Sequence, residues 1–409
     1  MPTRLRYPGV YVEETSSGVN TIAGVPTSIT LFIGMARQGD LNRPTIIRGF
    51  GEFEQIFGVD VSYGEIALQV KQFFLNGGSK AIVVRIEGDD GNTPELVDYE
   101  NAFSTVESEV DTFNLLTLPR GLAQTDDQRQ QLWGTASVFC QRQRAFLIVD
   151  PQGDWQTAAE AAAGVAEMRI GNVIDHAAIY WPRTMAASST LPIDPAGTIA
   201  GIMSRTDTQR GVWKAPAGKD AAILGVTGLE HVITSADNSI TNPQGINALR
   251  QFAGGAMVWG ARTMAGFEHS GESEYKYISV RRTALFIEES LSRGLELAMT
   301  EPNGERLWAQ VRIAVSAFMH SLFQLGAFQG AKASEAWFVR CDSSTTTQSD
   351  IDLGRVNLLV GFAPMRPAEF VVLKIQQSLG LPPPTQAPIQ TPTPTLTRKR
   401  VLPSGRRRR

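Results

Sequence analysis

The sequence predicts two regions of different fold class: an α/β domain with a mainly parallel sheet, and an α+β domain of two long helices and a small sheet. Three observations support this prediction. Between residues 21 and 270, near-continuous apolar strands alternate with helices, which is typical of a parallel sheet covered on both faces. From residue 273, two long amphipathic helices precede three β-prone runs. The chain has 409 residues, of which 42% are hydrophobic, so it can form two or three cores.

The α/β region contains six strand candidates, with helices between several of them. The strand candidates are residues 29–34, 81–86, 113–118, 145–150, 177–181 and 256–259. Helices are expected near residues 66–74, 124–142, 155–168 and 195–204. The first of these helices is expected to end at Asn76-Gly77-Gly78, because glycine readily takes the left-handed conformation that ends helices.

The C-terminal region contains two helices followed by strands. Helices are expected at residues 275–299 and 304–328, and strands at 336–340, 356–361 and 370–375. In the last run, Val371, Leu373 and Ile375 alternate with Val372, Lys374 and Gln376, which is the period of a strand with one buried face. Residues 313–331 carry no charge, but their polar side chains and single apolar stripe predict a core or interface helix rather than a membrane span.

Both ends of the chain differ in composition from its middle. Residues 1–20 predict an extended arm, and residues 381–409 predict a disordered tail rich in Pro and Thr, so the expected divisions are 1–20, 21–270, 271–380 and 381–409. The tail has no acidic residue, whereas the rest of the chain has 31 basic and 41 acidic residues. The tail's basic residues are Arg398, Lys399, Arg400, Arg406, Arg407, Arg408 and Arg409. Because this positive charge lies on a tail rather than on a folded face, nucleic acid is not expected as a specific ligand.

Motifs for catalysis, cofactor binding or metal binding are missing from the sequence. Gly218-Lys219-Asp220 has Asp where a phosphate-binding loop needs Ser or Thr. Asp175 and His176 are adjacent, so on a strand their side chains would point to opposite faces and could not pair. Asp126-Asp127 lacks the spacing of a calcium loop and is expected in a solvated loop. The sequence thus predicts no cofactor, no metal and no enzyme activity; an α/β hydrolase-like enzyme with a dispersed triad is the alternative.

Two β-prone runs near the ends of the folded part have no obvious hairpin partner. One is Val10-Tyr11-Val12 on the arm, and the other is residues 370–375. A strand of this kind satisfies its backbone by joining the edge of another sheet. If the edge belongs to another copy of the chain, the contact is heterologous and builds rings or helical filaments. A strand folded back onto its own subunit is the alternative.

Short motifs along residues 1–377 resemble those of the contractile tail sheath protein family, and their shared order and spacing carry the resemblance. The motifs are Tyr7-Pro8-Gly9-Val10-Tyr11-Val12-Glu13-Glu14, Gly211-Val212-Trp213-Lys214-Ala215-Pro216-Ala217-Gly218, Val258-Trp259-Gly260-Ala261-Arg262-Thr263, Arg281-Arg282, Glu301-Pro302-Asn303, Gly326-Ala327-Phe328-Gln329-Gly330, Phe338-Val339-Arg340-Cys341-Asp342 and Pro367-Ala368-Glu369-Phe370. Residues 17–28 most resemble the sheaths of extracellular, phage-tail-like injection systems, which we therefore prefer over a phage tail or a type VI secretion sheath.

The resemblance implies a structural subunit that polymerises as a helical tube of stacked hexameric rings around an inner tube. Such a sheath contracts from a metastable extended state and drives the tube through a target envelope. The implied partners are further copies of the chain or sheath paralogues, the inner tube protein, and baseplate and cap proteins. Assembly is expected in the cytoplasm, in a particle that is released from the cell in extracellular systems, and the sequence has no apolar signal segment behind Met1.

The resemblance also assigns the residues that join neighbouring subunits. It implies that two segments are exchanged as strands, namely Gly9, Val10, Tyr11, Val12, Glu13 and Glu14, and Phe370, Val371, Val372, Leu373, Lys374 and Ile375. The receiving sheet would contain Val356, Leu358 and Val360. The second long helix is the candidate for the surface that faces the tube. The tail after residue 380 departs from the family, whose members commonly end soon after the last strand.

Overall fold

The computed structural model describes residues 21–88, 91, 93–186, 189, 191–268, 273–296 and 301–368. All of these except Ala368 belong to one compact unit, Met1–Pro367.

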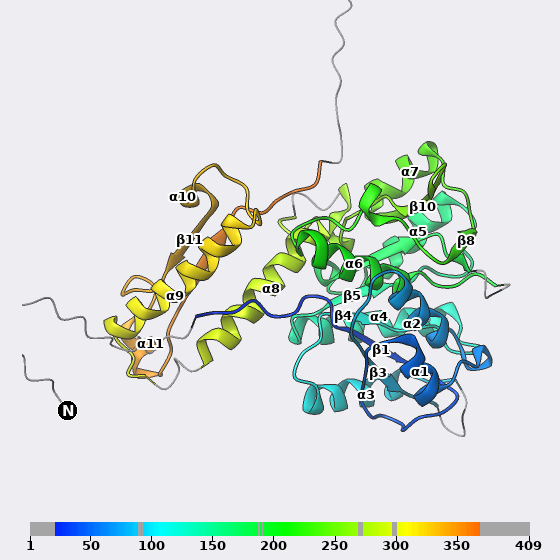
Figure 1. Ribbon diagram of the computed structural model, residues 1–409, viewed down its shortest axis with the longest axis horizontal. Coiled ribbons are helices and arrows are strands. Elements are labelled where there is room, and N and C mark those ends of the chain that lie inside the picture. The colour runs from blue at the N-terminus through cyan, green and yellow to red at the C-terminus, as the bar shows by residue number, and fades with distance from the viewer. Residues whose placement is uncertain are drawn as a thin grey trace, which may run out of the picture. The chain divides into compact units, whose positions relative to one another are not determined.

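An eight-stranded sheet forms the centre of the α/β domain (Figure 1). Its strand order is β10-β9-β6-β5-β4-β1-β3-β2. The strands are β1 (Thr30–Gly34), β2 (Thr45–Ile47), β3 (Ala81–Arg85), β4 (Leu115–Thr117), β5 (Phe146–Val149), β6 (Ala177–Trp181), β9 (Ile246–Phe252) and β10 (Gly255–Val258). Neighbouring strands are parallel except at the two ends of the sheet, where β2 and β10 are antiparallel to their neighbours. The prediction of a mainly parallel sheet is confirmed.

Helices cover both faces of the sheet, which explains why its central strands are largely apolar on both faces. One face is covered by α3 (Leu96–Glu109), α4 (Asp126–Arg142) and α5 (Ala158–Met168), and the other by α1 (Phe50–Phe57), α2 (Ile66–Leu75) and α6 (Ala196–Arg210). Successive residues of β1 enter opposite cores. Leu31 and Ile33 belong to the first core, whereas Phe32 belongs to the second and contacts Phe73 of α2, with ring centroids 5.5 Å apart.

Two glycines let α6 approach α2 unusually closely. A Cβ atom at Gly197 would lie 2.4 Å from the carbonyl oxygen of Gln69, and one at Gly201 would lie 2.4 Å from that of Phe73. The backbones of the two helices therefore touch, as in other pairs with small residues four positions apart. As predicted, α2 stops at this point: its last residue is Leu75, Asn76 is its C-cap, and Gly77 follows with a positive φ of 108°.

The sequence does not predict β9, although this strand lies inside the sheet between β6 and β10. Its residues include a fully buried Asn247, whose side chain donates hydrogen bonds to the carbonyls of Ile179 (3.1 Å) and Arg262 (2.7 Å). A polar residue with two buried partners interrupts the apolar pattern without interrupting the strand. A second small sheet, β7 (Thr184–Ala186) with β8 (Val226–Leu229), and helix α7 (Ser235–Thr241) are also absent from the prediction.

The C-terminal part forms a separate hydrophobic core. Its elements are α8 (Ile278–Leu295), α9 (Glu305–Gln324), α10 (Ala333–Ala336), β11 (Trp337–Arg340), α11 (Gln348–Asp352) and β12 (Leu359–Phe362). Helix α8 contributes to two cores, because Ile278 and Leu285 pack with the α/β domain whereas Ile287 and Leu291 pack with α9. The predicted apolar stripe of α9 is buried from Trp308 to Leu322. It does not extend to Leu325, which is 67% exposed because the helix ends at Gln324.

Candidate functional site

The three residues of the predicted receiving sheet pack against the core of α8 and α9. Val356, Leu358 and Val360 alternate with more exposed neighbours, although only Val360 lies within β12. Strand β12 pairs in antiparallel register with β11, from Arg340 opposite Leu359 to Trp337 opposite Phe362. Within the described residues this sheet has only these two strands, so its outer edges are free to pair with an added strand.

The outer face of the β11–β12 sheet carries two exposed apolar side chains beside the exposed Arg340, whose guanidinium lies 5.5 Å from the centre of the Phe338 ring. Phe338 is 48% exposed and Leu359 is 49% exposed. The ring of Phe338 lies over Gly361 on the opposite strand, where a Cβ atom would approach it to 2.2 Å. An exposed aromatic and aliphatic pair beside an open edge is a surface suited to contact with protein.

Helix α9 also presents a weakly charged outer face. Its exposed residues include Ile313, at 71%, and His320, whose ring nitrogen lies 3.1 Å from the amide nitrogen of Gln324. The helix carries no Lys, Arg, Asp or Glu after Arg312. Burial of this face against another chain would therefore remove few charges from water.

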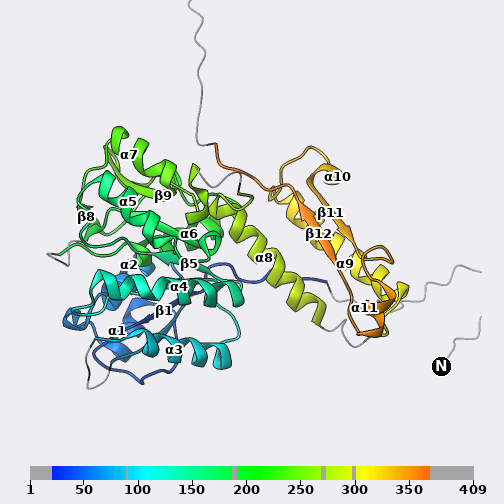
Figure 2. The ribbon, with the colours of Figure 1, turned by 180° about the vertical axis from the view of Figure 1, so that it is seen from behind.

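The N-terminal segment from residue 22 runs along α8 (Figure 2). Ile22 is buried in the α8–α9 core, and a Cβ atom at Gly294 would approach its side chain to 2.8 Å. The amide of Val25 donates to the Ser290 hydroxyl at 3.2 Å. These contacts mean that the chain enters the described fold beside α8, at the C-terminal core rather than at the parallel sheet.

A buried ion pair fastens this segment to α6 and α8. The Arg282 guanidinium donates to both carboxylate oxygens of Asp207, at 3.0 and 2.6 Å, and also to the carbonyl of Thr27 at 2.8 Å. The Thr27 hydroxyl donates to the same carboxylate at 2.7 Å. The two charged side chains are only 3% and 5% exposed, so the pair is bidentate and desolvated. The motif residue Arg282 thus has a structural role.

The expectation that Asp175 and His176 cannot pair is wrong. Both residues lie in a 3-10 helix, Ile174–His176, rather than on a strand, so their side chains are not forced to opposite faces. Asp175 Oδ1 lies 2.9 Å from Nδ1 of His176. Nη2 of Arg281 lies 2.7 Å from Nε2 and 3.1 Å from Nδ1 of the same ring. Arg281 thus contacts Nε2, the ring nitrogen that a catalytic histidine would direct at a nucleophile.

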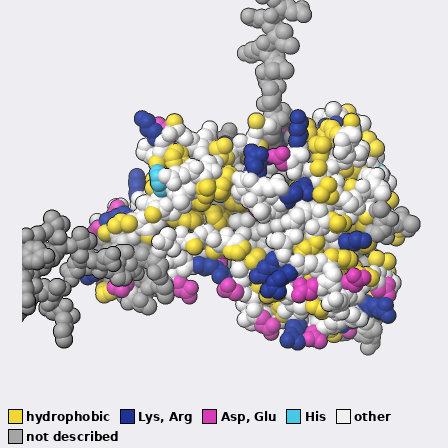
Figure 3. All heavy atoms as spheres, viewed as in Figure 1, with side chains coloured by type: hydrophobic (Ala, Val, Ile, Leu, Met, Phe, Trp, Pro, Cys, Tyr) yellow, Lys and Arg dark blue, Asp and Glu magenta, His cyan; other side chains and the backbone are white. Residues whose placement is uncertain are grey.

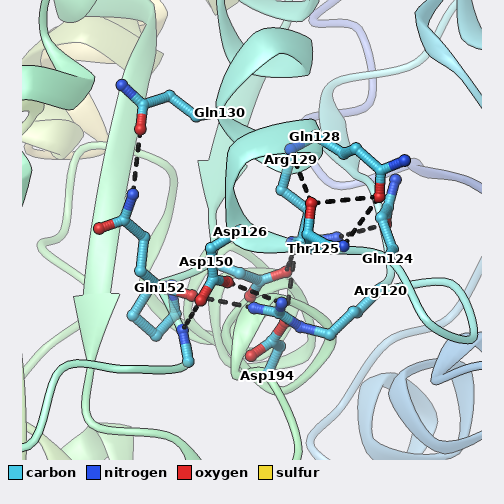
Figure 4. A network of polar contacts seen from close by, with 12 residues as sticks. Arg120, Gln124, Thr125, Asp126, Gln128, Arg129, Gln130, Asp150, Gln152 and Asp194 are labelled. Carbon is cyan, nitrogen blue, oxygen red and sulfur yellow. Dashed lines mark hydrogen bonds and ion pairs between the residues drawn. The ribbon is translucent and has the colours of Figure 1, made fainter.

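A network of charged side chains closes the edge of the sheet at which parallel α/β proteins commonly bind ligands (Figure 4). Arg120, which follows β4, lies 2.7 Å from Asp126 and 3.0 Å from Asp194. Arg129 of α4 lies 3.0 Å from Asp150, the residue after β5. The expectation of a solvated loop at Asp126 is wrong, because Asp126 begins α4 and pairs with Arg120. Burial acts to raise the pKa of Asp126, but the hydrogen bond from Arg120 contributes to a net lowering of this pKa.

The described residues hold no group of three or more His, Cys, Asp or Glu side chains arranged for a metal ion. Likewise, among these residues no helix is both long and apolar enough to cross a bilayer. Figure 3 shows basic and acidic side chains interspersed on the face that it presents.

Three predicted sets lie outside the described residues. They are Gly9–Glu14 of the arm, Phe370–Ile375 of the terminal strand and the basic residues between Arg398 and Arg409. The sequence also missed the buried network at the sheet edge. Its members are scattered between Glu65 and Asp194 and come together only in the fold.

Comparison with known proteins assigns this fold to the class of structural sheath proteins. Residues 93–264 match the central domain of phage tail sheath proteins, and residues 270–378 match the phage tail sheath C-terminal domain. The chain belongs to the contractile tail sheath protein family. Among curated protein sequences, none matches this chain.

Solved sheath structures are similar over nearly the whole chain. The contracted sheath of the extracellular contractile injection system PVC is 27% identical, with 92% of this chain and 99% of that chain covered and a TM-score of 0.74. The contracted helical sheath of the anti-feeding prophage (AFP) is 29% identical, with 91% and 99% covered and a TM-score of 0.74. A sheath tail protein from Desulfitobacterium hafniense, 12% identical over 87% and 100% of the two chains with a TM-score of 0.58, shares the fold.

Proposed function

We propose that this chain is the repeating subunit of an extracellular contractile injection system, in which it forms a helical sheath around an inner tube. The observation that carries the proposal is the similarity to the contracted PVC and AFP sheaths over at least 91% of the chain. The sheath would assemble in an extended, metastable state, as stacked hexameric rings on a baseplate and below a cap. Contraction would drive the tube through a target envelope. The same similarity favours this system over a phage tail or a type VI sheath.

Neighbouring subunits would be joined by exchanged strands. Residues 9–14 of one subunit and residues 370–375 of another would add to the open edges of the β11–β12 sheet. Each added strand would contribute a handful of backbone hydrogen bonds, at about 0.5–1.5 kcal/mol net each. Such bonds persist when subunits rotate, because strand pairing does not depend on side-chain contacts elsewhere. The weakly charged face of α9 is the proposed surface toward the tube.

The arm's role can be tested by deletion of residues 1–14. We expect a folded subunit that no longer forms sheath-like tubes in negative-stain electron microscopy. Deletion of residues 381–409 is the matched control, because it removes more residues while retaining both exchange segments and should leave tube assembly intact. Tubes of normal length from the arm-deleted variant would show that the arm does not join subunits.

The tail-deleted variant also tests a role for the basic residues Arg398–Arg409. We propose that the tail lies outside the lattice and binds an acidic surface, since the remainder of the chain has an excess of ten negative charges. Loss of binding to acidic surfaces in the tail-deleted sheath would support this role. Unchanged binding and assembly would leave a passive, solubilising tail.

A structural rather than enzymatic role is part of the proposal. The contact of Arg281 with His176 supports it, because this arginine blocks the histidine nitrogen that hydrolysis would need. Unpolymerised chains with hydrolase activity would contradict the sheath assignment and favour the α/β hydrolase alternative.

A further inference from the structure

Three carboxyl groups meet at the edge of the parallel sheet, one half-buried (Glu65) and two buried (Asp150 and Asp194), and we name them the carboxyl cluster. They come from three separate elements, since Glu65 precedes α2, Asp150 follows β5 and Asp194 precedes α6. The side chains of Asp150 and Asp194 are fully buried. The amide of Asp194 donates to Oε2 of Glu65 at 2.9 Å, and the amide of Ala196, in the first turn of α6, donates to Asp150 at 2.9 Å. The cluster therefore joins the sheet to both helices of the closely packed α2–α6 pair.

The positive charges around the cluster are too few to balance it. Arg129 is shared between Asp150 at 3.0 Å and Asp194 at 3.5 Å, and Arg120 is shared between Asp194 and the more exposed Asp126. The other charged or titratable groups that face the cluster are Arg183, which is held by Glu230 at 2.6 Å, and Tyr99, whose hydroxyl accepts a hydrogen bond from Gln124. Two guanidinium groups thus serve four carboxyls. With every carboxyl ionised, this site would hold two uncompensated negative charges, which is costly away from water.

One oxygen of the cluster lacks a hydrogen-bond donor. Oδ2 of Asp194 accepts from Nε of Arg120 at 3.0 Å, but Oδ1 is buried and has no partner. The hydrogen bonds of Glu65 fall on Oε2, which accepts from the Asp194 amide and from Gln69 at 3.2 Å. A buried carboxylate oxygen without a donor is unfavourable, whereas a proton on a neighbouring carboxyl would create one.

We propose that the carboxyl cluster retains protons at neutral pH and acts as a proton-linked latch between the sheet, α2 and α6. The charge imbalance and the unpaired oxygen of Asp194 are the geometric basis. Burial, and then repulsion from Asp194, raises the pKa of Glu65 to about 8 and that of Asp150 to about 7. Loss of these protons places unbalanced charge where the three elements meet, so the latch weakens as the pH rises.

The sign of the pH dependence follows from the proton count in the two states. In the unfolded chain both groups ionise near pH 4, whereas in the folded chain they remain protonated to about pH 7–8. The folded state therefore binds more protons, and the stability of the fold decreases as the pH rises from about 4 to 8. Each retained proton changes the unfolding equilibrium constant by about tenfold per pH unit.

The test compares Glu65→Gln with Glu100→Gln in the full chain by urea unfolding between pH 5.5 and 8.5. Glutamine at position 65 can still accept from the Asp194 amide and carries no charge, so it mimics the protonated state. Glu100 is an exposed residue of α3 and serves as the matched control. We expect the wild type and Glu100→Gln to lose stability with rising pH. In Glu65→Gln one retained proton is absent. The unfolding constant of this variant should therefore rise less steeply with pH than that of the wild type, by a factor of about ten per pH unit. Equal slopes in all three proteins would overturn the proposal.

Infrared spectroscopy detects the retained protons without unfolding the protein. A protonated carboxyl has a carbonyl band distinct from that of a carboxylate. We expect this band in the folded wild type at pH 7, with a lower intensity in Glu65→Gln and an unchanged intensity in Glu100→Gln. Absence of the band from the wild type at pH 7 would refute the latch, even if a variant failed to fold.

Discussion

Substitution of alanine for Gly201 tests whether backbone contact sets the distance between α2 and α6. The new Cβ atom would lie 2.4 Å from the carbonyl oxygen of Phe73 and 2.8 Å from Cβ of Asn76. Neither atom is the end of a flexible side chain, so one helix must move. The movement would also strain the cores that both helices bury on the same face of the sheet.

The structure predicts the sign of the effect from two opposing magnitudes. Alanine is favoured over glycine inside a helix by about 1 kcal/mol, whereas overpacking costs about 1–3 kcal/mol and more when backbone must shift. We therefore expect Gly201→Ala to lower the free energy of unfolding by about 1–2 kcal/mol. Gly134, in the middle of α4, is the matched control, because the nearest atom to its new Cβ would be 3.4 Å away. Gly134→Ala should be neutral or stabilise by up to about 1 kcal/mol.

Urea unfolding followed by tryptophan fluorescence would measure both variants against the wild type. The two substitutions make the same chemical change in a helix, so their difference isolates the contact between α2 and α6. Equal stabilisation by both alanines would refute the close approach at Gly201.

Two further predictions concern paired charges. Arg282→Met should destabilise the fold by about 3–5 kcal/mol, because it leaves the Asp207 carboxylate buried without its cation; the double variant with Asp207→Leu should recover most of this loss in urea unfolding. If the double variant is as unstable as Arg282→Met, the unpaired Asp207 carboxylate is not the cause of the lost stability. The second prediction concerns Asp175. Burial acts to raise the pKa of Asp175, but the hydrogen bond with His176 and the charge of Arg281 hold this pKa below its usual range. This contribution is present above about pH 4 and is lost as the pH falls through the lower folded-state pKa, so Asp175→Asn should flatten the acid side of a thermal-stability profile; an unchanged acid side would contradict it.

The main strands and helices could be predicted from the sequence because their side chains repeat with the period of each element. The fully buried β5 and the long stripe of α8 are examples. Prediction fails where a polar group is buried with a partner from elsewhere in the chain. Asn247 in β9 has two carbonyl partners, one of them 68 residues away, and a periodic pattern contains no sign of them.

The same limit applies to the chemistry. Asp126 was expected in solvent because adjacent carboxylates usually are, yet Arg120 pairs with it at the start of α4. The resemblance implied that Val356, Leu358 and Val360 belong to the receiving sheet. They do share the face that packs on the core, but strand pairing begins only at Leu359, where β11 is alongside.

The sequence by itself determined the fold class, the order of the main elements and the family, because these depend on local periodicity and on short motifs. Only the tertiary structure decided which polar groups are paired, which oxygen of Asp194 lacks a donor and how closely α2 meets α6. The physical reason is that hydrogen bonds, ion pairs and steric contacts depend on distances of a few ångströms. Residues such as Glu65 and Asp194, 129 positions apart in the chain, reach such distances only after the sheet has formed.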